Sequence, residues 1–157
     1  MADISHFTLL NDMQVFSENE MLDDVESHII ENLNPSFRLR PYQKEAFSRF
    51  QFYLEGYKKR QNPAHLLFQM ATGSGKTLIM AGCILHLYQK GYRNFLFFVN
   101  SSNIIDKTKD NFQNKASEKF LFNSSIQING ERIQVNEVDN FQAANDRDIN
   151  IHFTVTS

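Results

Sequence analysis

The fold of this chain is decided by residues 70–77, whose sequence is Met-Ala-Thr-Gly-Ser-Gly-Lys-Thr. An apolar run at 65–70 precedes the glycines and a helical pattern follows them to about Lys90, which predicts a buried strand, a loop and a helix. Such a loop leaves room for backbone N–H groups to surround phosphate oxygens, while its lysine binds the β- and γ-phosphates and its threonine binds Mg²⁺. The candidate ligands of ATP are Thr72, Gly73, Ser74, Gly75, Lys76 and Thr77, with Thr77 also the candidate Mg²⁺ ligand.

The loop departs from the general pattern G-x-x-x-x-G-K-[ST] at one position, because Met70 stands in place of the first glycine. Its place between an apolar run and a helix is the context that the motif requires, which favours nucleotide binding over a chance glycine-rich turn. A small-molecule P-loop kinase carries the same loop and is one alternative. In such a kinase the loop more often opens the chain.

Further elements are expected downstream of the loop. A continuous apolar run at 95–99 predicts a parallel strand covered on both faces, reached from the first strand by a right-handed crossover. The chain is therefore expected to be an α/β protein with a parallel sheet and flanking helices. The other expected elements are a polar helix from Asp106 to about Phe120, an Asn-Gly hairpin near 126–135 with Ile126 opposite Ile133 and Val135 on the same face, and a last strand at 149–155.

Charge divides the chain into two segments. Residues 1–36 contain eight acids and no lysine or arginine, whereas residues 37–157 hold sixteen bases and ten acids. An acidic helical segment at 1–36 and an α/β domain at 37–157 are therefore expected. A basic excess of this size fits either a nucleic-acid partner or an ordinary solvated surface.

Two helices are expected before the loop. Ser17 and Glu20 stand at capping-box spacing ahead of an apolar face that continues to Leu33, which predicts a helix. A second helix is expected from Pro41 to near Gly56, because proline is favourable in the first turn of a helix.

Composition excludes several classes of protein. Of the 157 residues 41% are hydrophobic and 13% aromatic, which excludes disorder and fibrous repeats. The single cysteine, Cys83, cannot form an internal disulfide, and no apolar stretch is long enough to span a membrane, so a cytoplasmic protein is expected. Cys83 is expected to be a small buried residue. No metal-ligand spacing is present among His6, His28, His65, His86 and His152, which are expected to be structural.

Three stretches together resemble the beginning of the motor domain of superfamily 2 DEAD/DEAH-type helicases and translocases. They are Leu-Arg-Pro-Tyr-Gln at 39–43, the loop at 70–77 and Phe-Phe-Val-Asn-Ser-Ser at 97–102. The chain is most similar to the Res subunit of type III restriction enzymes, whose motor often carries a Met-Ala-Thr-Gly-x-Gly-Lys-Thr loop, and residues 103–112 are similar too. The resemblance implies a partial RecA-like domain, an N-terminal fragment of an ATP-dependent DNA translocase, and a modification subunit as a partner.

The resemblance also implies an adenine-reading glutamine. Gln43 is at the position of the family's Q motif, and a glutamine amide pairs with the N6 and N7 edge of adenine. Arg40 and Tyr42 are weaker candidates for stacking on the ring. The alternatives are an exposed helix-surface amide for Gln43 and core packing for Tyr42.

Nucleic-acid ligands are implied after the strands, because the carboxyl ends of parallel strands face the ligand crevice. Asn100, Ser101 and Ser102 are small donors suited to phosphate oxygens, with helix capping as the alternative. Thr154 and Thr156 are further candidates at the end of the last strand. The lysines between 107 and 119 alternate with acids, which favours a solvated surface.

Hydrolysis of ATP needs an acid after a buried strand, a water-orienting carboxylate and an arginine. The acids at 137–139 and 146–148 precede rather than end predicted strands, so no catalytic residue is expected within this chain. A missing acid-bearing strand is expected to leave a sheet edge or an apolar face exposed, which favours self-association. A nucleotide-binding or protein-interaction module without catalysis is therefore the other alternative.

Overall fold

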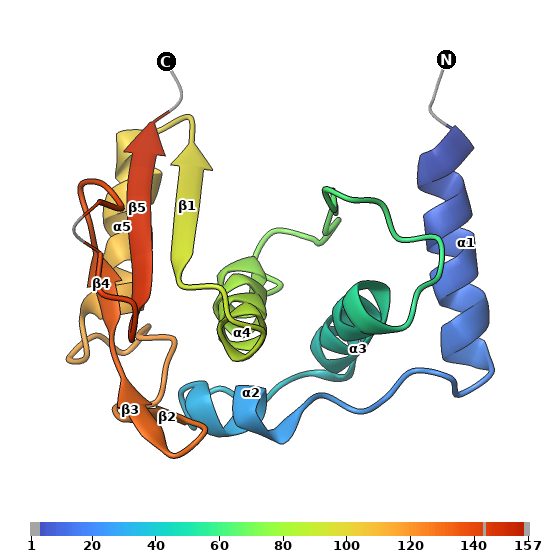
Figure 1. The fold of residues 1–157 in the computed structure, drawn as a ribbon, viewed down its shortest axis with the longest axis horizontal. Coiled ribbons are helices and arrows are strands. Elements are labelled where there is room, and N and C mark those ends of the chain that lie inside the picture. The colour runs from blue at the N-terminus through green and yellow to red at the C-terminus, as the bar shows by residue number, and fades with distance from the viewer. Residues whose placement is uncertain (1–3, 143, 156–157) are drawn as a thin grey trace. The chain divides into compact units, whose positions relative to one another are not determined.

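A computed structural model of the chain describes residues 4–142 and 144–155 (Figure 1). The described residues form two compact units. The first unit consists of Met1–Val25 and Leu39–Met70, and the second of Glu26–Arg38 and Ala71–Ser157. The predicted division into an acidic segment at 1–36 and a domain at 37–157 rests on charge rather than on packing, and it stays a prediction.

The first unit contains α1 (Ile4–Glu18) and α3 (Pro41–Glu55). The predicted bounds of α3 are confirmed, with Pro41 in the first turn and Gly56 at the C-cap. Aromatic rings join the two helices, since the centroids of Phe16 and Phe52 lie 4.7 Å apart. The core of this unit includes the buried side chains of Met13, Phe47, Phe50 and Tyr53.

A polar contact adds to this packing. The Tyr57 hydroxyl donates to Asp12 Oδ2 at 2.5 Å, and Lys59 Nζ lies 3.2 Å from the same oxygen. Because these hydrogen bonds favour the charged carboxylate, they lower the pKa of Asp12. The same bond to Asp12 raises the pKa of Tyr57 to about 12.

The prediction that a helix starts at Ser17 is wrong, because Ser17 lies in the last turn of α1, which ends at Glu18. Glu20 takes a left-handed conformation with φ 54°, and the Met21 N–H donates to the Phe16 carbonyl, which closes the helix. The Ser17 hydroxyl donates to Glu45 instead of capping a helix. Of the predicted apolar helix, only α2 (Ser27–Asn32) forms.

The buried strand predicted at 65–70 is also wrong. These residues belong to the first unit and do not form a strand. The Leu67 side chain is 70% exposed. Phe68 instead packs against Phe50 with the two rings tilted at 51° and their centroids 6.0 Å apart. An apolar run becomes a strand only when neighbouring strands satisfy its N–H and C=O groups, and no strand within the described residues pairs with it. The predicted crossover from this run to residues 95–99 is therefore absent from the described part of the chain.

The second unit is built on a parallel sheet of three strands in the order β1-β5-β4 (Figure 1). The strands are β1 (Asn94–Val99), β4 (Val135–Glu137) and β5 (Ile149–Val155), so the last predicted strand has the predicted bounds. The helix α5 (Ser102–Gln113) packs on one face through Phe112, whose ring lies 6.4 Å from that of Phe153. The expectation of a mixed α/β fold with a parallel sheet and flanking helices is confirmed.

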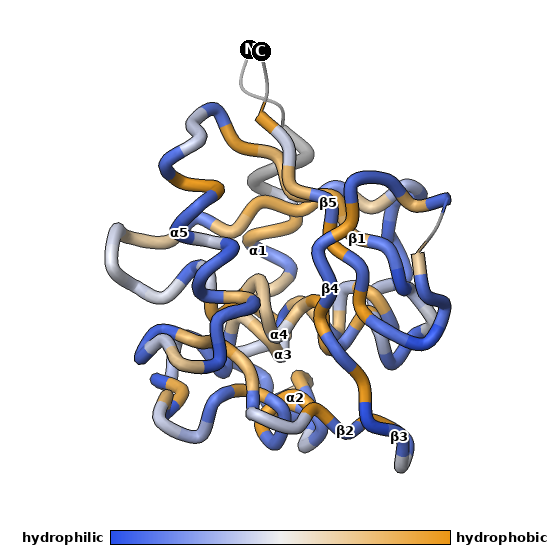
Figure 2. The backbone as a smooth tube through the Cα atoms, turned by 90° about the vertical axis from the view of Figure 1, so that its left-hand side faces the viewer, coloured by the Kyte–Doolittle hydropathy of each residue, from blue (hydrophilic) through white to orange (hydrophobic). Residues whose placement is uncertain are grey.

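Residues 95–99 were predicted to be buried on both faces of the sheet. This prediction is wrong for the face opposite α5. Leu96 and Phe98 are 48% and 58% exposed, although apolar colour runs along β1 in Figure 2. The helix α4 (Lys76–Gln89), which ends at the predicted place, makes its main contacts with α2 instead. Sheets that are parallel throughout are usually covered on both faces, and the exposed Leu96 and Phe98 depart from that rule.

The hairpin of β2 (Ile126–Ile128) and β3 (Glu131–Ile133) has the predicted register, with Ile126 opposite Ile133. Its turn residues Asn129 and Gly130 have φ values of 55° and 79°, as a type I′ turn requires. Val135 lies in β4 of the other sheet, so the prediction that the hairpin extends to 135 is wrong.

Two smaller differences concern polar segments. The predicted polar helix begins earlier than expected, after Ser101 at the N-cap, and ends earlier because Asn114 leaves the helical conformation. Glu137 ends β4, which contradicts the expectation that the acids at 137–139 only precede a strand, and its carboxylate pairs with Lys109. Within the described residues, none of the helices has the length and apolar character needed to cross a membrane.

Candidate functional site

The glycine-rich loop takes the conformation that its glycines allow. Gly73 and Gly75 have φ values of 77° and 86°, and Gly75 is the N-cap residue from which α4 begins at Lys76. A Cβ atom at Gly73 would meet no atom within 4 Å, so the glycine is required there by backbone conformation rather than by space. The loop therefore leads directly into the N-terminus of α4.

Lys76 bends back over the loop. Its Nζ donates to the Ala71 carbonyl at 2.8 Å, and the Ser74 N–H approaches the same carbonyl at 3.2 Å. Lys76 is exposed, whereas Ser74 and Thr77 are half-buried. An anion at the helix N-terminus would compete with the Ala71 carbonyl for this ammonium group.

The three residues of the predicted adenine site lie in the first unit. Gln43 is only 5% exposed and its Oε1 accepts the backbone N–H of Arg40 at 2.9 Å, so the alternative of an exposed surface amide is wrong. Tyr42 is 39% exposed, which excludes core packing. The Arg40 Nη1 atom lies 3.5 Å from the Tyr42 hydroxyl. The structure therefore gives Gln43 a capping role at the start of α3.

The candidate nucleic-acid ligands gather at the carboxyl end of the parallel sheet. Asn100, Ser101 and Ser102 follow β1, and Thr154 pairs with Phe98 near the end of β5. Ser101 occupies the N-cap position of α5, but its side chain makes no capping hydrogen bond within the described residues. Thr156 lies outside the described residues.

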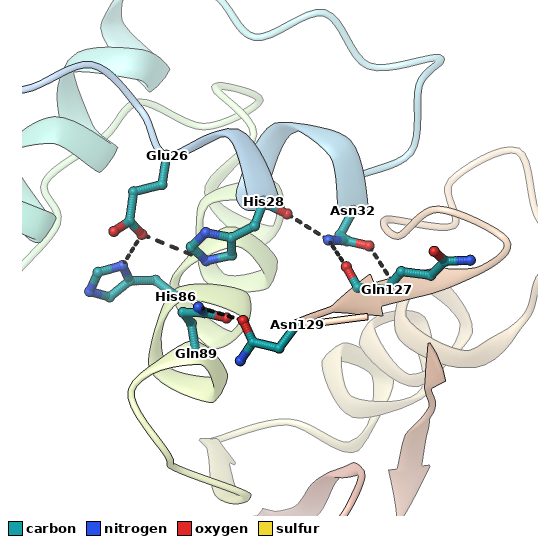
Figure 3. Close-up of polar contacts among 7 residues, drawn as sticks. All are labelled: Glu26, His28, Asn32, His86, Gln89, Gln127 and Asn129. Atoms are coloured by element: carbon teal, nitrogen blue, oxygen red, sulfur yellow. Dashed lines mark hydrogen bonds and ion pairs between the residues drawn. The ribbon is translucent and has the colours of Figure 1, made fainter. Parts of the chain in front are cut away.

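A polar cluster that the sequence analysis missed lies between α2 and α4, both in the second unit (Figure 3). It consists of Glu26, His28 and His86, whose ligand atoms all lie within 4.8 Å of one another, so two histidines without metal-ligand spacing in the sequence come together in the fold. The expectation that the histidines are structural stays a prediction. Spacing along the sequence gives no sign of the cluster, because Glu26 and His86 are 60 residues apart. Cys83, on the same helix as His86, is half-buried rather than fully buried as expected, and burial raises the pKa of its thiol to about 12.

The parallel sheet, the flanking helices and the glycine-rich loop together define a mixed α/β protein with the arrangement of a partial RecA-like domain. The family model described as "Type III restriction enzyme, res subunit" matches residues 36–157, and the chain belongs to this family. The predicted resemblance is thereby confirmed.

One curated relative has the name "Probable type III restriction-modification enzyme HindVIP Res subunit" and comes from Haemophilus influenzae. It is 44% identical over 119 residues, which cover 72% of this chain and 23% of the relative. The chain thus spans about a quarter of the length of this relative. No solved structure matches the chain.

Proposed function

We propose that this chain is the ATP-binding part of an ATP-dependent DNA translocase, the restriction subunit of a type III restriction enzyme. The observation that carries the proposal is the loop at 71–75, which leads into α4 with Lys76 and Thr77 in its first turn. Membership of the Res family supports the same conclusion.

In this proposal each part of the loop has its own role. The N–H groups of residues 73–77 bind phosphate oxygens, and Lys76 exchanges the Ala71 carbonyl for the β- and γ-phosphates of ATP. Thr77 holds Mg²⁺ through its hydroxyl. The cation and the Lys76 ammonium group together offset the negative charge of the triphosphate.

The rival functions have less support. A small-molecule P-loop kinase would explain the loop, but it would not explain the family match over residues 36–157. A non-catalytic interaction module agrees with the exposed apolar side chains of Leu96 and Phe98, and nucleotide binding separates it from the motor.

The test is calorimetric titration of the chain with Mg·ATP. Lys76→Ala is expected to weaken binding about 10–100-fold, because a hydrogen bond to a charged group contributes about 1.5–3 kcal/mol. Lys107→Ala, which removes an exposed lysine of α5, is the matched control and is expected to bind as the unchanged chain does. Equal affinities of the chain and Lys76→Ala, or no binding by the folded chain, would contradict the proposal.

A second arm of the same titration tests adenine reading. Gln43→Glu retains an acceptor oxygen for the Arg40 N–H and removes the amide donor that adenine N7 needs. Affinity for ATP is expected to fall toward that for GTP, while the helix content measured by circular dichroism stays the same. An unchanged preference for ATP would rule out Gln43 as the adenine reader and leave the phosphate loop unaffected. Arg40 and Tyr42 stay predictions as stacking partners.

DNA is the proposed track, bound through its backbone by Asn100, Ser101, Ser102 and Thr154. The paired substitution Asn100→Ala with Ser101→Ala is expected to weaken binding of mixed-sequence duplex DNA about 2–12-fold for each hydrogen bond lost. The loss is expected to be equal for different sequences. The salt dependence is expected to stay unchanged, because neutral donors release no counterions.

The matched control for the DNA measurement is Asn103→Ala, which removes an exposed amide from α5 a few residues further on. Fluorescence anisotropy at several salt concentrations measures both quantities. Wild-type affinity in the paired variant, or an equal loss in the control, would refute backbone binding by this loop.

The remaining partners are proposed from the family alone. A modification subunit is the expected protein partner of a Res subunit, and a cytoplasmic location follows from DNA as the substrate. Self-association through the face of Leu96 and Phe98 stays a prediction.

A further inference from the structure

The cluster of Glu26, His28 and His86 gathers three metal-ligating side chains around one point. Glu26 Oε2 lies 2.7 Å from His86 Nδ1 and 3.6 Å from His28 Nε2. All three ligand atoms lie within 4.8 Å of one another. Figure 3 shows both imidazole rings directed toward the Glu26 carboxylate. Around a tetrahedral Zn²⁺, neighbouring ligand atoms lie about 3.3 Å apart, so small side-chain adjustments suffice to bind the ion.

The elements that carry these ligands are held in place by a shared neighbour, the β2–β3 hairpin. Asn32 of α2 bonds the backbone of Gln127, with Nδ2 donating to its carbonyl at 2.9 Å and Oδ1 accepting its N–H at 2.7 Å. Gln89, near the end of α4, donates to Asn129 Oδ1 at 2.9 Å (Figure 3). The separation of the ligands is thus set by tertiary contacts outside the cluster, as a preorganised site requires.

A hydrogen bond between Glu26 and His86 does not account for the whole cluster. His28 Nε2 is buried and has no hydrogen-bond partner among the residues that the structure describes. A buried polar atom without a hydrogen-bond partner lowers the free energy of unfolding by about 1–3 kcal/mol. The Glu26 Oε2 atom lies 3.6 Å from His28 Nε2, which is too far for a hydrogen bond and suitable for two ligands of one ion.

The chemistry of the three groups favours a borderline-soft cation. Imidazole nitrogens suit Zn²⁺, whereas Mg²⁺ and Ca²⁺ prefer oxygen ligands. A ring nitrogen binds a metal only in its deprotonated form, and His28 Nε2 and His86 Nδ1 are the ring nitrogens nearest to the Glu26 carboxylate oxygen. The His86 side chain is fully buried, while those of His28 and Glu26 are 19% and 30% exposed.

We propose that Glu26 Oε2, His28 Nε2 and His86 Nδ1 bind one Zn²⁺ ion, with water as the fourth ligand. The ion joins the start of α2 to the last turn of α4, the helix that begins at the phosphate loop. Zinc takes the position between the Glu26 carboxylate and the His86 ring that a proton otherwise occupies. The inference stands apart from the proposed function, since none of its ligands belongs to the loop at 71–77.

The experiment uses the whole chain freed of metal by chelation and dialysis. Titration with Co²⁺ is expected to produce visible d–d absorption that saturates at one ion per chain and disappears when Zn²⁺ is added. Excess Mg²⁺ is expected to leave the absorption unchanged. Zn²⁺ is also expected to raise the Tm of the chain, because it binds the folded state in preference to the unfolded state.

Two variants remove ligands that are partly exposed, so that folding is retained. His28→Gln and Glu26→Gln are each expected to weaken Zn²⁺ binding by more than the roughly 10–100-fold that loss of an outer-shell partner costs. His65→Gln, which removes an exposed histidine of the first unit, is the matched control and is expected to bind zinc as the unchanged chain does. Lys76→Ala is likewise expected to keep zinc binding, which separates this test from that of the nucleotide site.

Several results would overturn the zinc site. They are saturation below one ion per chain, wild-type affinity in both folded ligand variants, and an equal loss of binding in His65→Gln. If one ligand variant fails to fold by circular dichroism, the other decides the question. If both fail, the Co²⁺ spectrum of the unchanged chain decides it, since an octahedral rather than a tetrahedral absorption would contradict the site.

Discussion

Replacing Phe112 with alanine is expected to lower the free energy of unfolding of the second unit by about 3–5 kcal/mol. Phe112 is 1% exposed, and its ring lies edge-on to Phe122 and Phe153 at centroid distances of 5.4 and 6.4 Å. The substitution removes the ring that joins α5 to the sheet and leaves a cavity between them. Each aromatic pair adds about 0.5–1.5 kcal/mol beyond its buried area.

Amide hydrogen exchange in β5 measures this effect within the second unit alone. Phe98→Ala is the matched control, because Phe98 belongs to the same sheet but is 58% exposed, and its loss is expected to cost no more than about 0.5 kcal/mol. Similar losses in the two variants would mean that α5 does not cover the sheet face as described.

Replacing Asn32 with alanine is expected to cost about 2–4 kcal/mol, because it leaves buried backbone groups without partners. In a two-residue hairpin, Gln127 and Arg132 form the non-hydrogen-bonded pair, so the N–H and C=O of Gln127 point away from β3. The Asn32 amide bonds both groups and so takes the place of a further strand at this edge. Asn32 is 2% exposed, and water cannot replace its amide without local opening.

The readout is hydrogen exchange at Gln127, which is expected to become fast in Asn32→Ala and to stay slow in Asn103→Ala, a variant of an exposed asparagine. Because Asn32 Nδ2 also donates to the His28 carbonyl at 2.7 Å, the same variant is expected to weaken Zn²⁺ binding. Retained protection at Gln127 would contradict the role assigned to Asn32.

Elements whose residues interact within one or two turns were predictable from the sequence. The helix from Pro41 and the helix after Lys76 have the predicted bounds, because their capping residues are local. The Asn-Gly turn determined the hairpin register, since two residues with positive φ place Ile126 opposite Ile133. In the same way, the glycine-rich loop identified the candidate phosphate site.

Elements that depend on distant neighbours were not predictable in the same way. Residues 65–70 form an apolar run much as β1 does, yet of the two only β1 pairs with a strand among the described residues. The prediction that β1 is buried on both faces failed for a related reason, since α4 makes its main contacts with α2, and Leu96 and Phe98 stay exposed. Hydrophobic periodicity shows which face of an element is apolar, but it does not show which other element packs against that face.

The sequence by itself therefore determined the glycine-rich loop, the family, the helices that begin at Pro41 and Lys76 and the Asn-Gly turn, because each depends on residues that are close along the chain. Only the tertiary structure decided which apolar run joined the sheet and which sheet face stayed exposed. It also decided that Glu26, His28 and His86 meet. The physical reason is that strand pairing and ligand sets need groups from separate elements to come within a few ångströms, and packing alone sets those distances.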